Sequence, residues 1–75
     1  MNTFTVSFDY EGKPPTKEYI TALLDGLTAQ SVSIVIWTVV TKMDQDQLQH
    51  YLDTVIKNAK KYKGGKVTSA TVEAG

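Results

Sequence analysis

The segment Val32–Val40 reads VSIVIWTVV, and the predicted fold is built around it. It is dense in β-branched residues, contains the single tryptophan, and has no charge, glycine or proline, as is typical of a central strand. Side chains alternate along a strand. One face would therefore carry Val32, Ile34, Ile36, Thr38 and Val40, and the other Ser33, Val35, Trp37, Val39 and Thr41. Both faces are largely apolar, so the pattern predicts that both are covered.

Composition indicates one small domain that spans residues 1–75. A core of this size gives only marginal stability, roughly 3–5 kcal/mol. With no cysteine and one histidine, the chain has neither disulfides nor the usual zinc ligands, and we expect no cofactor or metal. Self-association is the remaining way to bury more surface. Eight lysines balance eight carboxylates, and the absence of arginine argues against sequence-specific recognition of nucleic acid.

Two features of the chain bear on its location. No apolar run approaches the roughly 20 residues that a membrane span needs. Met1 is followed by Asn2-Thr3-Phe4 rather than by a basic region and an apolar stretch, so we recognise no signal peptide. We therefore expect a soluble, cytoplasmic protein without a membrane partner.

The N-terminal half predicts a strand, a loop and a helix. Thr3–Asp9 alternates between an apolar face with Phe4, Val6 and Phe8 and a polar face with Thr5 and Ser7. The glycine and two prolines that follow predict a loop, after which Thr16 can cap a helix. The apolar spacing predicts this helix over about Lys17–Ala29, with Gly26 inside it.

The C-terminal half predicts a longer helix and a weaker strand. Asp44 with Gln47 three residues later resembles a capping box, and the apolar stripe predicts a helix from about Gln45 to Tyr62. A glycine pair at 64–65 ends it. Lys66–Glu73 predicts a third strand, whose inward face the sequence leaves open.

The predicted fold is therefore a two-layer β-α-β-α-β domain. Short connections favour a three-stranded, mainly parallel sheet in the order 1-2-3, with right-handed crossovers and both helices on one face. The alternative has one helix on each face and strand order 2-1-3. It is disfavoured because it makes the first strand central, and that strand has a polar face.

This arrangement leaves one sheet face uncovered, and Trp37 would lie on it. An apolar strip of this kind marks interaction sites. The predicted function is a non-catalytic protein-interaction module, of the kind used as accessory or regulatory proteins by phages or plasmids, that forms a homodimer or binds another protein. The partner-binding residues would be Val35, Trp37, Val39, Thr5 and Ser7. The structural alternative is that Trp37 belongs to the core.

A second class of function rests on the lysines near the end of the second helix. They could contact phosphates, which is a sequence-independent and salt-sensitive attraction. In that case the protein is nucleic-acid-associated, through Lys57, Lys60, Lys61, Lys63 and Lys66. The simpler interpretation is that this positive charge complements the helix dipole.

Two further segments are candidate sites for a small ligand or an enzyme. The loop Lys13–Thr16 joins a strand to a helix, but its prolines remove backbone N–H groups that would bind phosphate. Asp46, His50 and Asp53 share one helix face, which projects opposite the apolar stripe and is predicted to be solvated. With no nucleophile–base pair in the sequence, we expect no enzyme activity.

Overall fold

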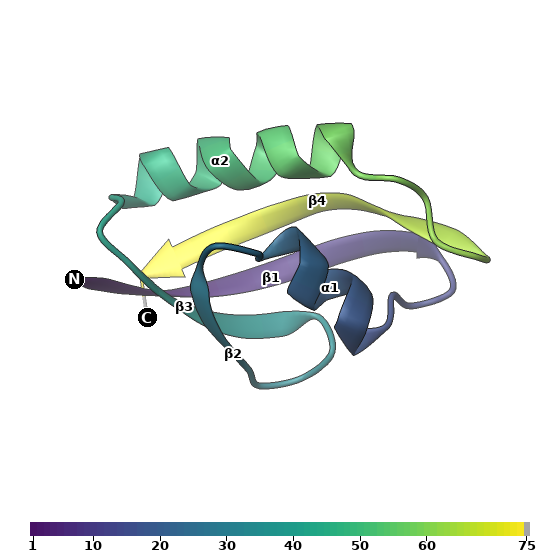
Figure 1. Cartoon of the computed structure of the whole chain (residues 1–75), viewed down its shortest axis with the longest axis horizontal. Helices are drawn as coiled ribbons and strands as arrows, with labels where there is room; N and C mark the ends of the chain where they lie inside the picture. The colour runs from purple at the N-terminus through teal and green to yellow at the C-terminus, as the bar shows by residue number, and fades with distance from the viewer. Residues whose placement is uncertain (75) are drawn as a thin grey trace.

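The computed structural model describes residues 1–74 as two helices packed on a four-stranded sheet (Figure 1). In chain order the elements are β1 (Asn2–Gly12), α1 (Lys17–Leu23), β2 (Thr28–Ser31), β3 (Ile36–Thr41), α2 (Gln45–Asn58) and β4 (Gly65–Ala74). The strand order is β2-β3-β1-β4, and each neighbouring pair is antiparallel. The strands β1 and β2 thus run in the same direction with β3 inserted between them, which is the split β-α-β, or ferredoxin-like, topology.

The prediction of a three-stranded, mainly parallel sheet in the order 1-2-3 is wrong, because one strand was missed. The segment Thr28–Ser31 forms β2, although the predicted first helix extended into it as far as Ala29. That helix ends at Leu23, and Gly26 follows with a φ of 86°, a left-handed conformation that glycine adopts readily. The additional strand reverses the chain, so β3 enters the sheet antiparallel to β1.

The segment Val32–Val40 is a turn followed by a strand. The backbone N–H of Val32 donates to the carbonyl of Ile36 at 2.9 Å, which closes the β2–β3 hairpin. The hydroxyl of Ser31 donates to the carbonyl of Ser33 at 2.9 Å, and the hydroxyl of Ser33 accepts from the N–H of Ile36 at 3.2 Å. Serine hydroxyls therefore stabilise a turn in a segment that has no glycine or proline.

The side chains of β3 face in the direction opposite to the one predicted. Trp37 and Val39 point towards the helices and are 4% and 0% exposed, whereas Ile36 on the uncovered face is 37% exposed. The indole N–H of Trp37 donates to the carbonyl of Ile34 at 2.8 Å, so its only polar atom is satisfied within the chain. The prediction that the helices leave Trp37 uncovered is therefore wrong.

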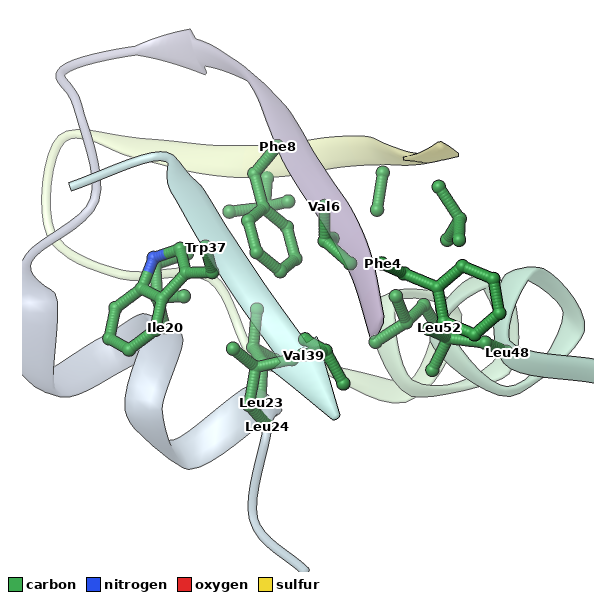
Figure 2. Close-up of a cluster of buried hydrophobic side chains, with 13 residues drawn as sticks. Phe4, Val6, Phe8, Ile20, Leu23, Leu24, Trp37, Val39, Leu48 and Leu52 are labelled. Atoms are coloured by element: carbon green, nitrogen blue, oxygen red, sulfur yellow. The ribbon is translucent and has the colours of Figure 1, made fainter. Parts of the chain in front are cut away.

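One apolar core lies between the helix layer and the inner face of the sheet (Figure 2). Phe4, Val6 and Phe8 of β1 are buried in its centre, which confirms the predicted apolar face of the first strand. The remaining contributions come from every other element except β2, and comprise Ile20, Leu23, Leu24, Trp37, Val39, Leu48, Leu52, Val67, Ala70 and Val72. In Figure 2 the side chains of α1 gather beside Trp37 and Val39, and those of α2 lie near Phe4.

The predicted start of the second helix is confirmed, and its predicted end is not. Asp44 caps α2 and forms the complete capping box with Gln47. The helix ends at Asn58, and an irregular segment leads from there to β4. Neither α1 nor α2 is long and apolar enough to span a membrane.

A bulge in β4 changes which of its side chains share the inward face. Asp9 pairs with Ser69, whereas Tyr10 pairs with Val67, so Thr68 is an extra residue in the ladder. Val67 and Ala70 consequently lie on the same, buried face although they are three residues apart. A strictly alternating strand would have placed them on opposite faces.

The burial of Trp37 within one copy of the chain predicts its fluorescence. The emission of Trp37 should be blue-shifted, and it should remain so when the folded protein is diluted, because no second copy is needed to cover the indole. The measurement is the emission maximum across a dilution series, with denaturant as the reference for exposure. A shift to red on dilution, while circular dichroism shows the fold intact, would contradict this burial.

Candidate functional site

The five residues predicted to bind a partner do not form one surface. Trp37 and Val39 are in the core, and Val35 is half-buried in the turn before β3, packed against the core. Thr5 and Ser7 lie on the opposite, uncovered face of the sheet. The Trp37 patch is therefore not available as a docking surface, because the indole that defined it is sealed by α1.

The lysines, by contrast, are brought together by the fold. Figure 1 shows the β1–α1 loop, the end of α2 and the start of β4 at the end of the molecule away from both termini. Seven of the eight lysines lie in these segments, at the start of α1 or in the connection from α2 to β4: Lys13, Lys17, Lys57, Lys60, Lys61, Lys63 and Lys66. The eighth, Lys42, follows β3 at the opposite end. A chain of zero net charge therefore has a strongly basic end.

A half-open hollow of about 320 Å³ lies within this basic end. Four of the five predicted lysines line it, and Lys63 does not. The lining residues are Tyr19, Ile56, Lys57, Ala59, Lys60, Lys61, Lys66, Val67 and Thr68. Ile56, Ala59 and Val67 are its apolar lining residues, and its charged groups are all positive. The volume is within the range of small-molecule sites, roughly 300–1,000 Å³.

Two tyrosines hold the segments around the hollow in place. The hydroxyl of Tyr19 on α1 donates to the carbonyl of Lys60, and the hydroxyl of Tyr62 donates to the carbonyl of Lys13. The two rings meet edge to face with their centroids 4.9 Å apart. These contacts tie the segment after α2 to α1 and to the β1–α1 loop, so the backbone that carries Lys60 and Lys61 is anchored at both ends.

A close approach of backbones completes the anchoring. Gly65 begins β4 against the end of β1, and a Cβ added to it would lie 2.3 Å from the carbonyl oxygen of Glu11. Only glycine fits there. The backbone N–H of Lys13 donates to the carbonyl of Gly64 at 3.0 Å. The glycines that the sequence suggested as a helix stop therefore also seat the lysine-bearing segment on the sheet.

The ammonium groups of the hollow are largely uncompensated. Lys66 forms an ion pair with Glu11 at 3.7 Å between partly exposed groups, a contact that solvent screens. It is the one ion pair between side chains found within residues 1–74. Lys57, Lys60 and Lys61 thus present their charge to solvent around the hollow, where an anion would be attracted.

The pKa of Tyr62 is higher than that of a free tyrosine. Desolvation raises its pKa above the usual 10.0, and the neighbouring Tyr19 and Tyr10 raise that pKa further. The neutral hydroxyl is therefore retained at high pH, which preserves its hydrogen bond to Lys13.

The other sequence-predicted segments contribute little to this hollow. The loop Lys13–Thr16 is bonded to its rim through Lys13 but supplies none of its lining residues. His50 lies on the exposed side of α2 and is not a lining residue. Among residues 1–74, no three acidic or histidine side chains are grouped in a way that could hold a metal ion.

Sequence reasoning found the lysines of the hollow and missed its other lining residues. Tyr19 comes from α1, about 40 residues before Lys60 in the chain, and only the packing of α1 beside the end of α2 brings them together. Val67 and Thr68 face the hollow because of the β4 bulge. No local pattern signals either relationship.

No protein-family model matches the chain, and neither a curated protein nor a solved structure is similar enough to count as a match.

The raised pKa of Tyr62 predicts an alkaline loss of stability. Folding favours its neutral form, so this contribution is present below pH 10 and is lost as the pH rises through the higher pKa of the folded state. The Tyr62→Phe variant should melt at a lower temperature at neutral pH, because it lacks the bond to Lys13, and its stability should fall less above pH 10. Thermal melts of both proteins across this range measure the difference, and parallel profiles would contradict the assignment.

Proposed function

We propose that the protein is a non-catalytic binding module that holds single-stranded nucleic acid by its phosphates at the lysine-lined hollow. The observation that carries this proposal is the grouping of Lys57, Lys60, Lys61 and Lys66 around one cavity. From the sequence alone, this positive charge could be explained by the helix dipole. In the structure it is arranged around a space that a ligand can enter. This supports the second of the three functions that the sequence suggested.

The chemistry of the lining suits the phosphates of a nucleic-acid backbone. Lysine is a compact point charge that binds phosphate oxygens without demanding a fixed orientation. Because the chain has no arginine, it lacks the planar fork that most often reads guanine, and we place the contact on the backbone rather than on the bases. Binding of this kind is independent of sequence and depends steeply on salt.

A single strand fits the hollow better than a duplex does. Its backbone can bend into a cavity, and its unpaired bases have free faces for stacking. Tyr19 lines the hollow and Tyr62 contacts its ring, so an aromatic surface lies next to the positive charges. Stacking on an aromatic side chain contributes about 1–3 kcal/mol per base.

The experiment compares two charge reversals at opposite ends of the molecule. Lys60→Glu/Lys61→Glu should weaken binding to a labelled oligo(dT), measured by fluorescence anisotropy, by on the order of tenfold to a hundredfold, since two phosphate contacts become repulsive. Lys42→Glu changes charge in the same direction away from the hollow and should have little effect. Both sites are exposed, so circular dichroism should show both variants folded.

The salt dependence supplies a second readout. With four lysines contacting phosphates, log K should fall against log[salt] with a slope of roughly −3 for a single strand. The charge-reversed variant should have a shallower slope. Equal losses for the Lys60/Lys61 and Lys42 variants would mean that the attraction is non-specific, and tighter binding to a duplex of equal length would contradict the preference for a single strand.

A further inference from the structure

The two edges of the sheet are treated differently by the rest of the fold. On β4, the carboxamide of Gln49 from α2 accepts from the N–H of Val72 at 3.1 Å and donates to the carbonyl of Ala70 at 2.7 Å. Gln45 donates to the carbonyl of Val72 at 2.8 Å. These are the outward-pointing backbone groups of the strand. The side chains of α2 thus occupy the positions that an added strand would take.

The outward groups of β2 belong to Ala29 and Ser31. Val32 donates to Ile36, and the register pairs Gln30 with Thr38, so even-numbered residues of β2 bond to β3. The odd-numbered residues therefore direct their N–H and C=O groups away from the sheet. Within residues 1–74, no side chain or loop hydrogen-bonds to the backbone of Ala29 or Ser31.

Apart from its short length of four residues, the β2 edge lacks the features that normally prevent strand pairing. Exposed edges are usually protected by lysine, proline, a bulge or a covering element. No charged residue and no proline occurs between Leu27 and Thr41. The hairpin that follows β2 exposes apolar side chains: Val32 is 69% and Ile34 49% exposed. An open, uncharged edge beside exposed apolar groups favours association with another strand.

We propose that a second copy of this chain pairs with β2 along this edge, antiparallel and about a two-fold axis at Gln30. Ala29 of one copy and Ser31 of the other then exchange a pair of hydrogen bonds, and the axis repeats that pair. Val32 of each copy lies opposite Thr28 of the other. The sheets of the two copies join into one continuous sheet.

A second copy is the occupant that the edge itself specifies. The segment Thr28–Ser31 is uncharged, so two copies meet without like-charge repulsion. The edge has no charge that would select an oppositely charged partner strand. When two identical strands pair antiparallel, each outward N–H of one copy can donate to an outward C=O of the other copy. The edge offers only two outward residues, so the dimer is weak and depends on concentration.

The absence of cysteine allows a sharp test. Gln30→Cys places a thiol on the axis, at a non-hydrogen-bonded pair where the two side chains are close. Under mild oxidation at high protein concentration it should form a disulfide dimer at least about tenfold faster than Thr71→Cys, because the axis raises the local thiol concentration. Thr71 is exposed on the same sheet face but belongs to β4, whose edge Gln49 occupies. Equal rates for the two variants would overturn the proposal.

Light scattering of the cysteine-free protein tests the dimer itself. The mass should rise towards that of two chains between micromolar and millimolar concentration. Gln30→Lys should remain monomeric because two ammonium groups would meet at the axis, whereas Thr71→Lys should dimerise as the parent does. Gln30 is exposed, so circular dichroism should show both variants folded. A parent protein that stays monomeric, or a Gln30→Lys variant that still dimerises, would overturn the proposal independently of whether nucleic acid is bound.

Discussion

The direction in which Trp37 points determines most of this structure. Burying the indole under α1 removes a large apolar surface from water, which is worth several kcal/mol at about 25 cal/mol per Å². The bond from its N–H to the carbonyl of Ile34 satisfies the polar atom at the same time. Because Trp37 faces the helices, Thr38 must face away. The uncovered side of the sheet consequently carries Thr5, Ser7 and Thr38 together with the partly exposed Ile36.

The same constraint explains which parts of the fold could be predicted from sequence. The first strand and the start of α2 were recognised because their signals are local: alternation in Phe4–Phe8 and a capping box at Asp44–Gln47. The strand Thr28–Ser31 was missed because its sequence is polar and short, and its stability comes from pairing with β3. A turn built by Ser31 and Ser33 carries no glycine or proline to reveal it. One missed strand then inverted the direction of β3 and the facing of Trp37.

The candidate site also has a part that the sequence reveals and a part that only the tertiary structure reveals. Its lysines are visible in the sequence because they are close together near the end of α2. The hollow they surround is a tertiary feature that depends on Tyr19 from α1 and on a bulge in β4. Charge grouping in a sequence therefore locates a basic region, but only packing can distinguish a solvated helix end from a cavity.

The helix α2 connects the two proposals physically. Gln45 and Gln49 fix its N-terminal half on the edge of β4, while the segment after its C-terminus forms the hollow. The helix thus blocks one edge of the sheet and leaves β2, on the far side, for association. The proposed dimer through β2 carries two hollows, one from each copy. Two weak phosphate sites linked in this way can engage one strand together, and the second contact is then intramolecular. A module with only four lysines at each site gains most from such pairing, because its individual contacts are screened by salt.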